Sequence, residues 1–129
     1  MIYRVAVKCS CFVIGVLCVA ACQRPAGSTY TDEYRGALQK VDDSIAAQSP
    51  QARKMVEQGL KAAEDSFAFY EYYARMGKYF CLSATPDSMV PYIDKVVQFA
   101  KKQPESPRRN SLLAFAYNTQ AANYHNFHK

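Results

Sequence analysis

The apolar positions of this chain recur at helical spacing in four segments, and no run of useful length shows the period of two that marks a strand. The first segment follows Thr31, a residue type favoured as an N-cap, with Asp32 and Glu33 in the positively polarised first turn. Its apolar stripe consists of Tyr34, Leu38, Val41 and Ile45. Ser49-Pro50 then ends this helix and starts the next, with Ser49 as N-cap.

The second segment predicts one long helix from about Gln51 to Met76 or Lys78. One apolar face is formed by Met55, Leu60, Ala63, Phe67, Tyr70 and Ala74, and a second by Phe69, Tyr72, Tyr73, Met76 and Phe80. The charged residues Glu64, Glu71, Arg75 and Lys78 occupy a narrow strip. Glu71 and Arg75 have the i,i+4 spacing that favours an ion pair. Gly77 is expected to end the helix or to kink its last turn.

A helix that is apolar over most of its circumference is either the central helix of a domain or meets another chain. We expect Phe67, Tyr70 and Tyr73 to face the core. The residues left over on the second face, and therefore the candidates for self-association, are Phe69, Tyr72 and Met76.

The third segment begins after Thr85, an N-cap candidate followed by Pro86. Its apolar face consists of Met89, Val90, Ile93, Val96, Val97 and Ala100. An interior proline costs about 3 kcal/mol. Therefore either Pro91 falls early enough in the helix to be tolerated, or the regular helix begins near Ser88.

The fourth segment begins with Ser106 as N-cap and Pro107 at the first helical position. It packs through Leu112, Leu113, Phe115, Ala116 and Thr119. Residues 123–129 are a polar-aromatic tail that should fray. The pattern as a whole predicts an all-α protein with a single small four-helix domain over residues 32–122.

The N-terminus has two positive charges and then an uncharged, mostly apolar run, which is typical of a secretory signal and too short to span a bilayer as a mature helix. Residues 1–21 are therefore expected to be a lipoprotein signal peptide, because Val-Ala-Ala-Cys at 19–22 resembles a bacterial lipobox. Lipidation, including palmitate, would fall on Cys22. The alternative is general signal-peptidase cleavage after Ala21. By resemblance to enterobacterial lipoprotein sorting, Gln23 implies the outer membrane, on its periplasmic face. Residues 22–31 are expected to form a flexible tether.

Removal of that signal changes both charge and cysteine content. The formal net charge is +5, and loss of Arg4 and Lys8 leaves +3. The five cysteines become two, Cys22 and Cys81, so lipidation of Cys22 leaves Cys81 unpaired. A mildly basic periplasmic protein gives no reason to expect a nucleic-acid partner.

No catalytic motif is present in the sequence, and we expect neither an enzyme nor a cofactor. The histidines His125 and His128 supply two possible metal ligands without a third, so no metal site is expected. Cys81 has no histidine close in sequence to activate it. A binding protein is the class that remains.

Positive charge gathers around one loop, with only Glu105 against it. Prolines stiffen this loop, so it can meet a partner at little ordering cost, and its cations favour an acidic cleft. We expect the segment Gln103 to Arg109 to be the main recognition element. The candidate partner-binding residues are Lys101, Lys102, Gln103, Pro104, Pro107, Arg108 and Arg109.

The runs "GLKAAEDSFAFYEYYARMGKYFCLS", "VPYIDKVVQFAKKQPE" and "SPRRNSLLAFAYNTQA" together resemble the Rap/Tai family of type VI secretion immunity proteins, over Gly59 to Ala121. The resemblance implies a small periplasmic helical protein, usually a homodimer, that binds and blocks a peptidoglycan amidase by placing a loop in its cleft. Cys81 matches the first cysteine of the family pattern. The second has no counterpart here, which removes the usual disulfide.

A different class shares the size, the helices and the anchor. In this alternative the chain is a helical outer-membrane lipoprotein, either a secretion pilotin or a plasmid entry-exclusion lipoprotein, that holds a partner helix in an apolar groove. Gene neighbours distinguish the two: an amidase gene favours immunity, and a secretin or conjugation operon favours the alternative.

Overall fold

The structure is a computed structural model that describes residues 30–83 and 85–127. Within these ranges the chain forms five α-helices, one short 3-10 helix and no strand, which confirms the all-α class. The elements are α2 (Asp32–Ala46), α3 (Ala52–Ala62), α4 (Ser66–Cys81), η1 (Pro86–Met89), α5 (Val90–Lys101) and α6 (Pro107–Phe127). The predicted signal peptide, Cys22 and the tether up to residue 29 lie outside the described residues.

Helix α2 begins as its sequence predicts. Thr31 has extended backbone angles, and its Oγ1 accepts a hydrogen bond from the backbone N–H of Tyr34 at 3.1 Å. The buried positions are Leu38, Val41 and Ile45, three of the four in the predicted stripe.

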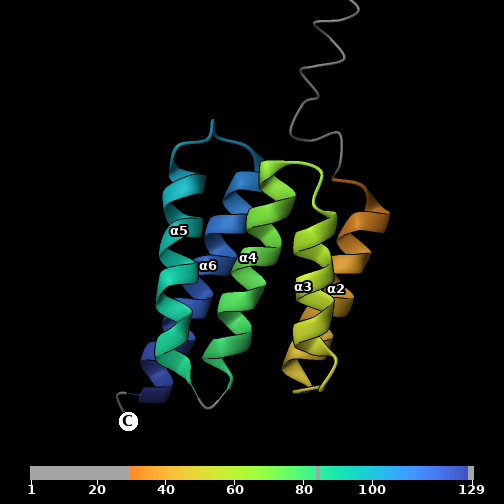
Figure 1. Cartoon of the computed structure of the whole chain (residues 1–129). Coiled ribbons are helices and arrows are strands. Elements are labelled where there is room, and N and C mark those ends of the chain that lie inside the picture. Colours follow the sequence, from red (N-terminus) through yellow and green to blue (C-terminus); the bar gives the residue numbers. More distant parts are fainter. Residues whose placement is uncertain (1–29, 84, 128–129) are drawn as a thin grey trace, which may run out of the picture.

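The prediction of one long helix from Gln51 is wrong, because the chain breaks between α3 and α4. Ala63 is extended, and the carboxylate of Asp65 accepts a hydrogen bond from the backbone N–H of Ala68 at 2.7 Å. Asp favours such caps over helix interiors, since its side chain satisfies an N–H that the first turn leaves open. The break lets α3 fold back along α4 (Figure 1).

Gly77 neither ends nor visibly interrupts α4, which continues to Cys81. The glycine is instead explained by close packing. A Cβ at this position would lie 2.8 Å from Cδ1 of Ile93 and 3.2 Å from Cβ of Tyr92. The missing side chain therefore lets α5 approach α4 closely.

The start of α5 settles the question of Pro91. Pro86 lies in η1, and Pro91 falls in the first turn of α5, where its missing N–H is tolerated. Ser106 caps α6, because its Oγ accepts from the backbone N–H of Arg109 at 3.1 Å. Helix α6 then continues to Phe127, beyond the expected end of the domain at residue 122.

Helix α4 lies between two hydrophobic cores, which it shares (Figure 1). Toward α5 and α6 the core consists of Phe67, Ala74, Cys81, Met89, Ile93, Val96, Ala100, Leu112 and Ala116. Toward α2 and α3 it consists of Leu38, Val41, Ile45, Ala52, Val56, Tyr72 and Met76. The aromatic helix is therefore the central helix, and its two apolar faces serve two internal cores.

This arrangement corrects the self-association prediction. Tyr72 is 9% exposed and Met76 is 5% exposed, because α2 and α3 cover them. Phe69 remains 38% exposed and is the only residue of that group on the surface.

Candidate functional site

The basic loop joins α5 to α6 at the end of the bundle where α2 also begins (Figure 1). Lys101, Lys102, Pro104 and Pro107 are exposed, and Gln103 is partly buried. Backbone hydrogen bonds close the end of α5, from Gln103 N–H to the carbonyl of Ala100 at 3.0 Å and from Lys102 N–H to that of Phe99 at 3.1 Å. The loop is therefore short and hydrogen-bonded at its base.

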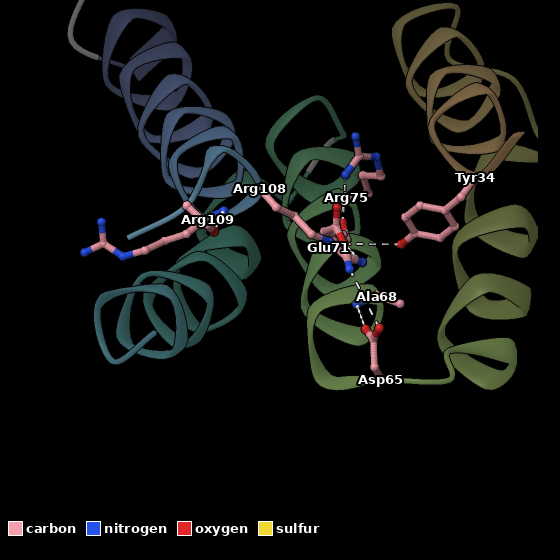
Figure 2. A network of polar contacts seen from close by, with 8 residues as sticks. Tyr34, Asp65, Ala68, Glu71, Arg75, Arg108 and Arg109 are labelled. Carbon is pink, nitrogen blue, oxygen red and sulfur yellow. Dashed lines mark hydrogen bonds and ion pairs between the residues drawn. The ribbon is translucent and has the colours of Figure 1, made fainter. Parts of the chain in front are cut away.

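Arg109 stabilises the loop from its C-terminal side, at the start of α6. Its Nε donates to the backbone carbonyl of Ala100 at 2.9 Å, and its Nη1 donates to Oδ1 of Asn110 at 3.3 Å. The first bond ties the start of α6 to the end of α5. Figure 2 shows the Arg109 side chain directed away from the polar network around Glu71.

Arg108 is not available to a partner, and this part of the predicted recognition element is wrong. The residue is 5% exposed, and its guanidinium donates through Nε and Nη2 to Oε1 of Glu71, at 2.9 Å and 2.5 Å. Its Nη1 lies 3.7 Å from the carboxylate of Asp65 (Figure 2). The N-terminal end of α6 is thus fastened to α4.

Three aromatic rings surround the same guanidinium. Its central carbon lies 4.8 Å from the ring centroid of Tyr30, 5.0 Å from that of Phe67 and 5.6 Å from that of Tyr34. Cation–π attraction adds to the ion pair in such an environment. Tyr30 directly precedes the N-cap of α2, so the chain just before α2 packs on the arginine that follows the loop.

A second buried arginine extends the network. Arg75 Nη2 bonds to Oδ2 of Asp42 at 2.8 Å, and its Nη1 donates to the backbone carbonyl of Glu71 at 3.0 Å. The expected i,i+4 ion pair is therefore replaced, because the Glu71 carboxylate bonds to Arg108 instead. The guanidinium also lies 4.5 Å from the ring centroid of Phe115.

Burial dominates the titration of the groups at the centre of this network. It raises the pKa of the Glu71 carboxyl above its usual value, against the opposing effect of the Arg108 hydrogen bond and charge. The same cause raises the pKa of the Tyr34 phenol, whose hydroxyl donates to Glu71 at 3.4 Å. The network has no exposed nucleophile or base. Its ion pairs join α6 to α4 and α4 to α2, which is a structural role.

Cys81 lines a groove between α4 and α6. The other lining residues are Lys78, Leu82, Phe115, Asn118, Thr119 and Ala122, and the volume is about 250 Å³. The thiol Sγ lies 3.7 Å from the backbone carbonyl of Thr119, and burial raises its pKa. The thiol is therefore protonated at neutral pH and is a poor nucleophile.

Metal ligands do not converge within residues 30–83 and 85–127, where no group of three or more His, Cys, Asp or Glu side chains is placed to hold an ion. His125 is exposed near the end of α6, and His128 lies outside the described residues. None of the helices in the described part of the chain has the length and apolarity needed to cross a membrane.

The structure is that of a small all-α protein in which two neighbouring arginines point in opposite directions. Arg108 points inward and fastens α6 to α4, and Arg109 points outward and fastens α6 to the end of α5. No family model, curated protein or solved structure matches the chain.

Proposed function

We propose that this protein is a periplasmic, lipid-anchored immunity protein that binds and blocks a peptidoglycan amidase. The resemblance over Gly59 to Ala121 suggests the class of partner. The observation that carries the proposal is the α5–α6 loop, which is exposed at the end of the bundle and braced on both sides. A loop held in this way loses little conformational entropy when it enters a cleft, so more of its contact energy contributes to affinity.

The charges of the loop suggest the chemistry of the surface it meets. Lys101 and Lys102 are exposed, Arg109 is half-buried, and Glu105 is the only acid among residues 101–109. Such a group of cations speeds association with an acidic cleft and fixes the register of the complex. Because Arg108 is buried, the recognition set is reduced to Lys101, Lys102, Gln103, Pro104, Pro107 and Arg109.

The test has two steps: a search of the neighbouring genes for a peptidoglycan amidase, and then a measurement of whether this protein binds and inhibits that amidase. The triple variant Lys101→Glu, Lys102→Glu and Arg109→Glu should slow association at least about tenfold at low salt. The matched control reverses three exposed lysines elsewhere, Lys40→Glu, Lys54→Glu and Lys95→Glu, and should bind nearly as the wild type does. Full amidase activity in the presence of excess wild-type protein would reject the proposal.

The lipid anchor is the second part of the proposal. Cys22 would carry acyl chains, which hold the protein on the periplasmic face of the outer membrane. Several chains on one residue give effectively permanent attachment, at about 0.8 kcal/mol per buried CH₂. Mass spectrometry of the membrane fraction measures the added acyl mass. Cys22→Ser should release the folded protein into the soluble periplasm; a mature N-terminus without acyl mass contradicts the anchor.

The groove between α4 and α6 favours a second candidate, a secretion pilotin or plasmid entry-exclusion lipoprotein. Its lining is mainly apolar, and its volume of about 250 Å³ is enough for one or two side chains of a partner helix. In that case Phe115→Lys should abolish partner binding, and the triple charge reversal in the loop should leave it unchanged. The two candidates therefore give opposite results with the same pair of variants.

A further inference from the structure

A second cavity lies at the end of the bundle opposite the α5–α6 loop, where the α2–α3 turn meets the C-terminal end of α4 (Figure 1). Its volume is about 360 Å³, within the range of roughly 300–1,000 Å³ that is usual for small-molecule sites. The apolar part of its lining consists of Ile45, Pro50 and Leu82, and the polar part of Gln48, Ser49, Tyr79 and Ser83. An apolar surface with a few polar groups is the usual composition of a ligand site.

The α2–α3 turn holds Gln48 in an unusual backbone conformation. The backbone N–H of Ser49 bonds to the carbonyl of Ser44 at 3.0 Å. The N–H of Gln48 bonds to the carbonyl of Ile45, also at 3.0 Å, which completes the Schellman pattern of a helix end. This pattern places Gln48 in the left-handed region, with a φ of 51°. Glycine is the usual residue there, because a side chain strains the conformation, and such strain gathers at sites that bind ligands.

The side chains of this turn supply both donors and acceptors to the cavity. Gln48 Nε2 donates to the backbone carbonyl of Leu82 at 3.3 Å, which joins the turn to the end of α4, and its amide oxygen is an acceptor. Ser49 Oγ accepts from the backbone N–H of Gln51 at 3.2 Å, and its hydroxyl proton is a donor. The Tyr79 side chain adds an aromatic ring with a hydroxyl at its tip.

The charge of the lining restricts the class of ligand. Among the residues that the structure describes, no Asp, Glu, Lys or Arg lines this cavity. A phosphate, a carboxylate or a cation would lose its water here without gaining a counter-ion. The ligand that fits is uncharged, with C–H groups on its face and hydroxyl or amide groups on its edge, which is the composition of a neutral sugar.

We propose that this cavity binds an uncharged N-acetylated saccharide of one or two sugar units, and that Gln48 recognises the acetamido group. The amide of that group matches the donor and acceptor of the Gln48 side chain. Its methyl group suits the apolar surface of Ile45 and Leu82. Because the bond to Leu82 holds the Gln48 amide in position, little ordering is needed when the sugar binds. This inference does not rest on the proposed function.

Isothermal titration calorimetry of the purified full-length protein with di-N-acetylchitobiose tests the proposal. The wild type should bind this disaccharide saturably. Cellobiose has the same pair of rings without acetamido groups and should bind at least about tenfold more weakly. A wild type that does not bind di-N-acetylchitobiose overturns the proposal, and equal binding of the two sugars overturns recognition of the acetamido group.

Gln48→Gly separates binding from stability. The variant removes the amide and relieves the strained φ, so it should bind di-N-acetylchitobiose at least about tenfold more weakly while its melting temperature equals or exceeds that of the wild type. Gln98→Ala removes an exposed amide on α5 and should bind as the wild type does. Wild-type binding by Gln48→Gly would overturn the role of Gln48.

A free sugar and a glycan strand both offer this chemistry, and co-sedimentation with purified insoluble peptidoglycan distinguishes them. Sedimentation of the wild type that excess di-N-acetylchitobiose reverses, and that Gln48→Gly lacks, identifies a strand as the ligand. A wild type that binds the disaccharide but does not sediment with the polymer identifies a free sugar.

Discussion

Arg108 and Arg109 are neighbours in the sequence, and the helix turns them in opposite directions. Arg108 enters a desolvated site between Glu71, Asp65 and three aromatic rings, whereas Arg109 stays at the surface and bonds to a backbone carbonyl. A buried ion pair contributes little when compared with a hydrophobic replacement, but removal of one partner leaves the other charge buried and unpaired. The free energy of unfolding should therefore respond very differently to the two arginines.

We expect Arg108→Ala to lower the free energy of unfolding by about 3–5 kcal/mol, a large share of the 5–15 kcal/mol typical of a small domain. Arg109→Ala removes the hydrogen bonds to Ala100 and Asn110 at a half-exposed site and should cost about 1 kcal/mol. Urea denaturation measures both. The double variant Arg108→Met with Glu71→Met removes the pair together and should recover most of the loss; equal destabilisation by the two single variants would contradict this account.

Glu71 gives the network a dependence on pH whose sign follows from its raised pKa. The folded state binds the Glu71 proton more tightly than the unfolded chain, whose pKa is near the ordinary 4.5. Its contribution to stability is therefore largest below about pH 4.5 and declines as pH rises through the folded pKa, by about 1.4 kcal/mol for each unit of the shift.

The variant Glu71→Gln keeps an oxygen acceptor for Arg108 and removes the titration. Its free energy of unfolding should equal that of the wild type near pH 4 and exceed it at pH 7, in a series of urea titrations across this range. The opposite result, a variant that is less stable than the wild type only at neutral pH, would show that attraction to Arg108 outweighs burial of the carboxylate.

At the scale of the helices, much of the fold could be predicted because local rules and packing agree. The caps Thr31 and Ser106 and the early position of Pro91 follow from the hydrogen bonds that helix ends leave open. The break before α4 could not be predicted from the apolar pattern, because the helical periodicity continues through it. The residue type at Asp65, which is favoured as an N-cap, was the indication in the sequence that a helix begins there.

The central site was less accessible to sequence reasoning. Glu71 and Arg75 have helical spacing, which alone predicts a solvated ion pair. Their burial depends on α2 and α6 covering that strip of α4, and contacts at a sequence distance of about 35 residues leave no local pattern. The one local indication of their burial is the surrounding sequence, because both charges lie inside the most aromatic stretch of the chain.

Two glycines in helices test the role assigned to close packing. A Cβ added at Gly36 in α2 would meet nothing within 4 Å, and Gly36→Ala should raise the free energy of unfolding by about 0.5–1 kcal/mol through helix propensity. Gly77→Ala gains the same propensity but meets Ile93 and Tyr92, and overpacking costs about 1–3 kcal/mol. We expect Gly77→Ala to be less stable than the wild type in thermal unfolding. A similar gain from both would mean that α5 moves away at no cost.

At the scale of the whole molecule, the charge distribution separates three surfaces. The cationic α5–α6 loop lies at one end, residues 110–127 of α6 contain no Asp, Glu, Lys or Arg, and the groove beside Cys81 opens between α4 and α6. The two candidate functions would therefore use different surfaces, the loop for an amidase and the groove for a partner helix.

The position of α4 between two cores also determines how the molecule opens. Helices α2 and α3 contact the rest of the domain chiefly through α4, and so do α5 and α6. Either pair can detach in a partial unfolding event, but α4 loses its protection only when both pairs have left. In hydrogen–deuterium exchange its amides should therefore be the slowest, with an opening free energy equal to that of global unfolding, while α2 and α3 exchange through a smaller unit. A helix that belongs to both cores is the last part of the chain to reach solvent.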